Sequence, residues 1–100
     1  MEKNFASILI TNYNKGSFLK KTLKSCLKQN YKDKEILVYD DSSTDDSQKI
    51  LKAFKKKIKI IINKKKKFKS APLNQIDGII SLVKRSKGEF IFLLDGDDEF

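Results

Sequence analysis

Apolar positions along the chain follow two alternating periods. Short apolar runs rich in Ile, Val and Phe are typical of strands that are buried on both faces of a sheet. Between these runs, apolar residues recur every three or four positions, which is typical of amphipathic helices. The pattern predicts strands at 7–12, 35–40, 58–63 and 89–95, and helices at 18–29, 43–54 and 74–86.

The order of the predicted elements is βαβαβαβ. Strands that alternate with helices normally form a parallel sheet, which the helices cover on both faces. The sequence therefore predicts an α/β fold: a Rossmann-like three-layer α/β/α arrangement around a mostly parallel sheet. Ser43 and Asp46 fit a capping box, which would start the second helix at residue 43. A chain of 100 residues without a Gly/Pro/Ser-rich linker has room for one domain.

Charge is concentrated in one long basic stretch. The chain has 22 Lys and Arg against 13 Asp and Glu, and no acid occurs from Lys49 to Ile76. Such a stretch is compatible with binding to nucleic acid or to an anionic surface. A lysine-rich edge strand that resists pairing with other chains is the preferred interpretation. Nucleic-acid sites usually interleave aromatic residues with arginine, and Arg85 is the only arginine.

The single cysteine and the absence of histidine exclude two kinds of site. Cys26 has no partner for a disulfide within the chain, and a Cys/His metal centre lacks its ligands. The spacing of Cys26 from Leu19 and Leu23 predicts a buried apolar role. No apolar run approaches the roughly 20 residues that span a bilayer, and the first residues lack the layout of a signal peptide. We therefore expect a cytoplasmic protein.

The acids gather where two predicted strands end. Eight of the 13 acids lie in the segments 40–46 and 95–99. In parallel α/β sheets, ligands bind beside the carboxyl ends of the strands. Tyr13 and Thr11, at the end of the first strand, offer a ring face and a hydroxyl there, and Asp41 offers an acceptor for the N–H of a base or a ribose hydroxyl.

The last acidic segment has the pattern of a site for a hard metal ion. Asp95 and Asp97 flank Gly96, so two carboxylates follow a strand where the backbone is free to bend. Oxygen ligands of this kind suit Mg²⁺ or Mn²⁺, which usually share their coordination with substrate phosphates. A solvated acidic turn is the alternative, and the three-residue spacing does not decide between the two.

Together these segments resemble family 2 glycosyltransferases with a GT-A fold. SILITNYN, the helix after it and VYDDSSTDDS resemble the opening of that family, and KGEFIFLLDGDD resembles its later block with the Asp-x-Asp motif. The resemblance covers nearly the whole chain and is weakest at 55–75. It implies that Thr11 and Tyr13 line the nucleotide base and that Asp41, with Asp40 beside it, contacts the base or ribose.

The resemblance also implies a reaction. Family members transfer a sugar, with inversion, from a nucleotide-diphosphate donor to a saccharide or lipid hydroxyl, and a UDP-sugar is the expected donor here. Asp97 falls on the direct ligand of the Mg²⁺ or Mn²⁺ that neutralises the leaving diphosphate, and Asp95 falls on a position that reaches the ribose or the metal. The implied role is polysaccharide or cell-envelope synthesis, which allows peripheral association with the inner face of the membrane. No nucleic-acid partner is expected.

The resemblance further implies that part of the enzyme lies elsewhere. In the family, the general base and the acceptor-binding half follow the Asp-x-Asp motif. We therefore expect residues 1–100 to be the N-terminal, nucleotide-binding part of an incomplete domain, inactive alone, with its fourth strand unpaired on one side and its general base beyond Phe100. SAPLNQ replaces the Arg-Asn pair that is common in the family, so no donor-binding role is carried over to Asn74.

Two other classes of protein remain open at this point. A phosphatase of the haloacid dehalogenase type also has Asp-x-Asp after an apolar strand, but on an early strand and followed by Thr or Val. Here Asp98 and Glu99 follow the motif. A basic module that binds nucleic acid or an anionic surface explains the lysines but leaves the acidic strand ends without a role.

Overall fold

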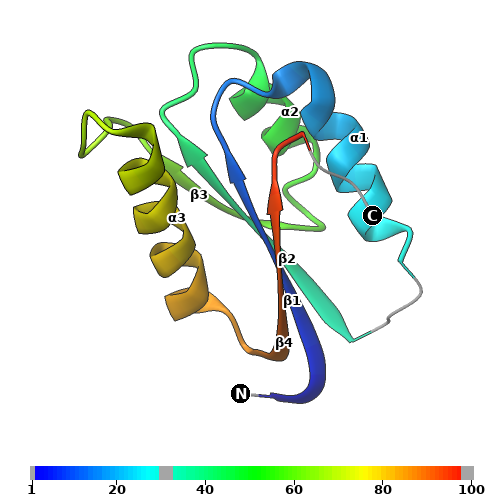
Figure 1. Ribbon diagram of the computed structural model, residues 1–100. Helices are drawn as coiled ribbons and strands as arrows, with labels where there is room; N and C mark the ends of the chain where they lie inside the picture. The colour runs from blue at the N-terminus through cyan, green and yellow to red at the C-terminus, as the bar shows by residue number, and fades with distance from the viewer. Residues whose placement is uncertain (1, 30–32, 98–100) are drawn as a thin grey trace.

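The computed structural model describes residues 2–29 and 33–97 of the chain. These residues form four strands and three helices in the predicted order (Figure 1). The strands are β1 (Glu2–Asn12), β2 (Lys34–Asp41), β3 (Lys59–Asn63) and β4 (Gly88–Asp95), and the helices are α1 (Gly16–Leu27), α2 (Ser47–Ala53) and α3 (Ala71–Arg85). The predicted α/β fold class is confirmed.

The strands of the described residues form one parallel sheet in the order β3-β2-β1-β4. The chain adds β2 and β3 on one side of β1 and then returns to the other side of β1 with β4. The strand order therefore reverses between β1 and β4, and ligands of open α/β sheets bind beside such a reversal, at the carboxyl ends of the strands. The lysine-rich segment supplies β3, which is an edge strand as the preferred interpretation requires.

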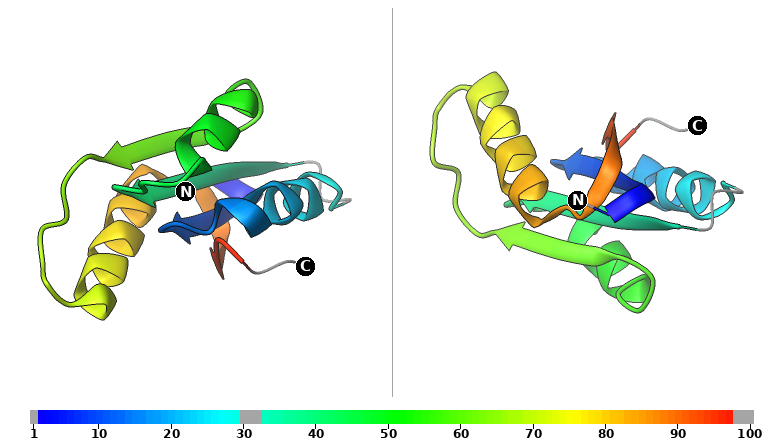
Figure 2. Two further views of the ribbon diagram at one scale, coloured as in Figure 1. Left: turned by 90° about the horizontal axis from the view of Figure 1, so that it is seen from above. Right: turned by 90° about the horizontal axis from the view of Figure 1, so that it is seen from below.

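The sheet separates two apolar layers. Helices α1 and α2 pack on one face through Leu19, Leu23, Cys26 and Leu51, which contact Ile8, Ile10, Ile36 and Val38. Helix α3 packs on the other face, where Leu82 contacts Leu9, Leu37 and Tyr39. Figure 2 shows the twisted sheet passing between α3 and the α1/α2 pair. Cys26 is fully buried, as predicted, and this burial raises the pKa of its thiol to about 11.

Helix α2 begins later than predicted, and the capping box does not form. The helix starts at Ser47, and Asp46 makes no side-chain cap bond. Asp45 instead accepts the backbone N–H of Ser47 and that of Gly16, both at 2.9 Å. Burial would raise the pKa of Asp45, but the hydrogen bonds from Ser47 and Gly16 outweigh it and lower the pKa. The acidic loop therefore holds the starts of two helices together.

Helix α3 turns an unexpected face to the sheet. The predicted apolar face consists of Ile76, Ile79, Ile80 and Val83, but Ile76 and Ile80 are 52% and 49% exposed. The buried stripe is Asn74, Gly78 and Leu82. Gly78 lies against the ring of Tyr39, where a Cβ atom would come within 2.7 Å. The glycine that lowers helix propensity thus allows α3 to approach β2 closely.

A buried carboxylate joins the strands at their amino ends. Glu35 accepts hydrogen bonds from Ser7 Oγ at 2.7 Å, Lys59 Nζ at 2.9 Å and the backbone N–H of Lys87 at 2.6 Å. Ser7 Oγ in turn accepts the N–H of Gly88 at 2.8 Å. Burial would raise the pKa of Glu35, but the hydrogen bonds from Ser7, Lys59 and Lys87 outweigh it and lower the pKa. Glu35 therefore ties β1, β3 and the start of β4 to β2.

We expect Glu35→Gln to lower the free energy of unfolding by about 1–3 kcal/mol near neutral pH, because it removes the carboxylate that these donors share. The folded-state pKa lies below the unfolded one, so the contribution is complete above the unfolded pKa and disappears as the pH falls through the folded pKa. Urea denaturation across this pH range measures both effects. Glu89→Gln, at an exposed position of β4, is the control. Equal losses for the two variants, or a difference that persists in strong acid, would contradict the assignment.

Candidate functional site

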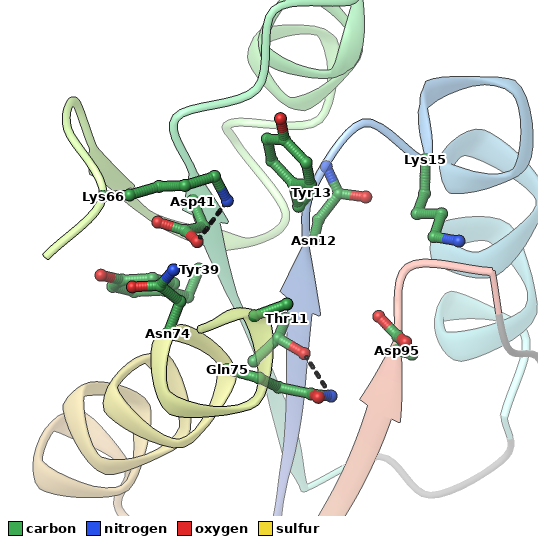
Figure 3. A pocket seen from close by; sticks show the side chains of 11 residues that line it. Thr11, Asn12, Tyr13, Lys15, Tyr39, Asp41, Lys66, Asn74, Gln75 and Asp95 are labelled. Atoms are coloured by element: carbon green, nitrogen blue, oxygen red, sulfur yellow. Dashed lines mark hydrogen bonds and ion pairs between the residues drawn. The ribbon is translucent and has the colours of Figure 1, made fainter. Parts of the chain in front are cut away.

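A pocket lies at the carboxyl ends of β1, β2 and β4, beside the first turn of α3 (Figure 3). Four of the predicted site residues line it, namely Thr11, Tyr13, Asp41 and Asp95, together with Asn12, Lys15, Tyr39, Lys66, Ala71, Asn74 and Gln75. Its volume is about 150 Å³, whereas small-molecule sites usually measure roughly 300–1,000 Å³. The pocket therefore has room for one flat part of a ligand.

An ammonium group lies between an aromatic ring and a carboxylate on one side of the pocket. The ring of Tyr13 is partly exposed, and Lys66 Nζ lies 3.4 Å from its centroid. The same Nζ donates to Asp41 Oδ2 at 2.9 Å. Asn63 Nδ2 donates to the other oxygen, Asp41 Oδ1, at 3.0 Å. Figure 3 shows Lys66 reaching this position from the loop before α3.

The other side of the pocket is formed by neighbouring residues of β1 and β4. Thr11 and Asp95 are partners in the parallel register. Thr11 Oγ1 accepts a long hydrogen bond of 3.5 Å from Gln75 Nε2, and Asp95 Oδ1 accepts the N–H of Gly96 at 2.9 Å. Because β1 lies between β2 and β4, Asp41 and Asp95 face the pocket from opposite sides of Thr11 (Figure 3). A hydroxyl and two carboxylates therefore surround one small space.

Asp40 lies behind this rim instead of in the pocket. Its side chain is fully buried. One carboxylate oxygen accepts from Asn12 Nδ2 at 2.9 Å and Ser43 Oγ at 2.6 Å, and the other accepts the N–H of Ser43 and Gln48 Nε2, both at 3.1 Å. Direct contact between Asp40 and a nucleotide stays a prediction. The geometry favours a supporting role, in which Asp40 joins the loops that follow β1 and β2.

Asn14 adds a second link between these two loops. Its backbone lies in the left-handed region with φ of 50°, which asparagine tolerates better than most residues. Its Oδ1 accepts the N–H of Thr44 at 2.7 Å and that of Asp45 at 3.2 Å, and its own N–H donates to Ser43 Oγ at 3.0 Å. The strand-end segment TNYN therefore contributes structural contacts as well as pocket residues.

The Asp-x-Asp segment forms a tight turn beside Asn12. Gly96 is buried, and a Cβ atom there would collide with the Asn12 amide, so the close approach requires glycine. The carbonyl of Gly96 accepts a hydrogen bond from Thr22 Oγ1 at 2.8 Å. Asp97 follows the turn with its side chain 38% exposed, and its Oδ2 lies 3.5 Å from Lys15 Nζ. Asp98 and Glu99 lie outside the described residues.

The donor set of this turn fits a magnesium-type ion that a ligand helps to hold. Asp95 and Asp97 offer carboxylate oxygens, which are hard ligands. Within residues 2–29 and 33–97, no group of three or more Asp, Glu, His or Cys side chains is placed to enclose an ion. Mg²⁺ and ions like it are usually held by one or two carboxylates together with substrate phosphates. Asp95 in the lining of the pocket and Asp97 two residues further on, paired with the lining residue Lys15, offer the one or two carboxylates that such an ion needs.

Asn74 holds the loop that carries Lys66. Its side chain is buried, its Oδ1 accepts the N–H of Phe68 at 3.0 Å, and its Nδ2 donates to the carbonyl of Phe68 at 2.8 Å. Sequence reasoning missed five of the pocket residues, namely Lys15, Tyr39, Lys66, Ala71 and Gln75. The place of Gln75 in the pocket could have been predicted, because the start of α3 faces the strand ends. No local pattern distinguishes Lys66 from the lysines around it.

The sequence comparisons decide the family. The model described as "Glycosyl transferase family 2" matches residues 7–100. The chain belongs to glycosyltransferase family 2. The family predicted from the TNYN, VYDDSSTDDS and Asp-x-Asp segments is therefore confirmed.

Two relatives illustrate the match within this glycosyltransferase family. The chain is 34% identical over 97 residues to the GalNAc(5)-diNAcBac-PP-undecaprenol beta-1,3-glucosyltransferase of Campylobacter jejuni, covering 93% of this chain and 29% of that protein. It is 32% identical over 99 residues to the UDP-Glc:alpha-D-GlcNAc-diphosphoundecaprenol beta-1,3-glucosyltransferase WfgD of Escherichia coli, covering 98% and 37%. The chain thus spans about a third of the length of these relatives.

Solved structures of glycosyltransferases share the fold. Residues 1–349 of S. aureus TarS superpose with a TM-score of 0.78 at 25% identity, covering 95% of this chain and 28% of that one. The mannosyltransferase PcManGT from Pyrobaculum calidifontis, solved with GDP-Man and Mn²⁺, gives a TM-score of 0.77 at 15% identity, covering 95% and 28%. These likenesses confirm the predicted GT-A architecture. Among the residues that the structure describes, none of the helices combines the length and the hydropathy of a transmembrane span.

The supporting role of Asp40 predicts a large effect on folding. Asp40→Asn places an N–H₂ group against donors from Ser43 or Gln48, so we expect it to lower the free energy of unfolding by about 2–4 kcal/mol. Asp97→Asn is the control, because the side chain of Asp97 is 38% exposed, and it should cost less than about 1 kcal/mol. Chemical denaturation of the two variants measures the difference. A stable Asp40→Asn variant would contradict the supporting role.

Proposed function

We propose that the protein carrying this chain is an inverting glycosyltransferase, and that these residues bind the nucleotide diphosphate of its donor. The observation that carries the proposal is the meeting of Tyr13, Asp41, Thr11 and Asp95 around one pocket. A base that stacks on Tyr13 beside Thr11 presents its N–H to Asp41, and the ribose then lies toward Asp95. A UDP-sugar is the donor proposed, in keeping with the UDP-Glc named for the E. coli relative.

We further propose that Asp97, with Asp95, binds Mg²⁺ or Mn²⁺ together with the donor diphosphate. The bound ion would act as a Lewis acid for the leaving diphosphate. Asp95 lines the pocket, and Asp97 follows two residues later and pairs with Lys15, which also lines the pocket. In this proposal the base lies at Tyr13 and Asp41, and the diphosphate lies toward Asp95, Asp97 and Lys15. Lys15 lines the same pocket beside Asp97 and adds positive charge where the diphosphate would lie.

The general base and the acceptor site belong, in this proposal, to residues outside 1–100. These 100 residues are the nucleotide-binding part of the domain and are inactive alone. The relatives support this arrangement, because the matched region makes up only 29% and 37% of their lengths. Strand β4 also supports it, because it is an edge strand whose side chains from Phe90 to Leu93 are 41–54% exposed. Further segments of the domain would cover these apolar side chains.

The proposed acceptor is a saccharide, free or lipid-linked, and the proposed setting is cell-envelope polysaccharide synthesis at the inner face of the membrane. The names of both relatives include an undecaprenol-linked diphosphate. Helix α1 and its C-cap support membrane association through Lys20, Lys24 and Lys28, which are exposed and spaced four residues apart. Lysines on such a face are attracted to anionic lipid headgroups.

The metal proposal predicts that Mn²⁺ strengthens UDP binding and that Asp97→Asn removes most of this strengthening. We expect a loss of at least about 10- to 100-fold in affinity with Mn²⁺, the loss that removal of even an outer-shell partner causes at other metal sites, and little change without metal. Isothermal titration measures both. Asp77→Asn, which removes an acid of α3 that pairs with Lys67 in the preceding loop, is the control. UDP binding that is equally tight with and without Mn²⁺ would overturn the metal role. Salt-sensitive RNA binding without any binding of nucleotides would favour the basic-module alternative.

The membrane proposal predicts a loss of vesicle binding when the lysines of α1 are neutralised. Because each lysine near an anionic surface contributes about 1 kcal/mol, changing Lys20, Lys24 and Lys28 to Gln should weaken binding to phosphatidylglycerol vesicles by one to two orders of magnitude. The control changes Lys64, Lys65 and Lys69 to Gln, which removes the same charge before α3. Co-sedimentation measures binding, and equal effects of the two triple variants would refute a role for the α1 face.

A further inference from the structure

Lys66 occupies the space in which the proposed function places the base. It belongs to the lysine-rich loop between β3 and α3, and its side chain lines the pocket with about a third of its surface exposed. Its ammonium lies 3.4 Å from the centroid of the Tyr13 ring and 2.9 Å from Asp41 Oδ2. The two groups proposed to recognise a base are therefore both engaged by one cation (Figure 3).

The contact with the Tyr13 ring and the hydrogen bond to Asp41 both come from the Lys66 ammonium, so they are lost together. A cation over the face of a tyrosine ring is attracted by the negative face of the π-system, and a partly buried carboxylate gains from an ammonium at hydrogen-bond distance. When the ammonium leaves, Asp41 keeps one hydrogen bond, from Asn63, and its second oxygen becomes available. A ligand can therefore replace Lys66 as the donor to Asp41 Oδ2, whereas Oδ1 keeps its hydrogen bond from Asn63 at the end of β3.

A base and the Lys66 ammonium cannot occupy this position at once. A flat base that stacks on Tyr13 requires the ring face at van der Waals distance, which the ammonium takes up at 3.4 Å. We propose that Lys66 is an internal competitor for the base: it keeps Tyr13 and Asp41 in place while the pocket is empty and leaves when a nucleotide binds. This inference rests on the proposed function, because it assumes that the pocket receives a base.

The loop that carries Lys66 is anchored on both sides of the lysine. On one side, Asn63 donates to Asp41 and to the carbonyl of Lys65 at 3.0 and 2.8 Å. On the other, Asn74 makes two hydrogen bonds to the backbone of Phe68. With the backbone held at both ends, the displacement is a rotation of the flexible four-carbon side chain. The pocket can therefore open without unfolding the loop.

The competitor lowers the affinity for every base by the same factor. When a binding-competent state is only partly populated, the apparent affinity falls in proportion to that fraction. If Lys66 fills the position about nine-tenths of the time, removing its side chain tightens binding about tenfold. Discrimination between bases is unaffected and stays with the hydrogen-bonding pattern of Asp41. A direct contact from Lys66 to the ligand has the opposite consequence, because its removal then weakens binding.

Nucleoside and nucleotide titrations of the intact protein separate these two consequences. Uridine is the sharper probe because it is uncharged, so the loss of a lysine near a diphosphate does not affect it. We expect Lys66→Ala to bind uridine, and UDP without metal, about tenfold more tightly than the wild type. Lys66→Arg keeps the competing cation and should stay near the wild-type affinity. Lys65→Ala removes the same charge from the neighbouring, exposed position and should also change little.

Proton NMR of the wild-type protein tests the contact itself without any variant. Because Lys66 Nζ lies over the Tyr13 ring, the adjacent Hε protons should resonate upfield of those of other lysines and move to ordinary shifts as UDP is added. Two results would overturn the role of Lys66 and leave the proposed function standing. One is that Lys66→Ala binds uridine and UDP no more tightly than the wild type does. The other is that the Hε shifts do not respond to bound UDP. If neither protein binds UDP with or without Mn²⁺, the proposed function falls, and this inference falls with it.

Discussion

The rim of this sheet depends on one buried carboxylate. Asp40 accepts hydrogen bonds from Asn12 on β1 and from Ser43 in the loop after β2, so the ends of two strands are joined through it. The Asn12 side chain, held in this way, is also the surface against which Gly96 packs. The Asp-x-Asp turn is therefore positioned through Asn12 by Asp40. Such a buried charge is tolerated because both of its oxygens have donors.

The fold follows from the sequence more completely than the site does. The two periods of apolar residues predict all of the described elements and their order, because burial on one or both faces constrains local spacing. The same periodicity is wrong for α3, where Ile76 and Ile80 remain half exposed and the buried stripe contains Gly78 and Asn74. A face can be apolar without facing this sheet, and only the close contact between Gly78 and Tyr39 shows which face packs.

The residues at the strand ends could be predicted to line the site, whereas the residues that loops bring to it could not. Thr11, Tyr13, Asp41 and Asp95 meet because parallel strands bring their carboxyl ends to one edge, which topology alone predicts. Asp40 and Asp41 are neighbours in sequence, yet one is sealed behind the rim and the other lines the pocket, since successive side chains of a strand point to opposite sides. The place of Lys66 depends on the course of a loop fixed by Asn63 and Asn74, which no local spacing reveals.

A crystal structure of the intact protein with UDP and Mn²⁺, with anomalous data at the manganese edge, would locate the base and the metal in one experiment. We expect the uracil against Tyr13 with its N–H on Asp41, the Lys66 ammonium displaced from the ring, and the anomalous peak next to Asp97 and the diphosphate. UDP bound elsewhere, for instance along the lysines of α1, or a manganese peak away from the Asp-x-Asp turn would contradict this expectation.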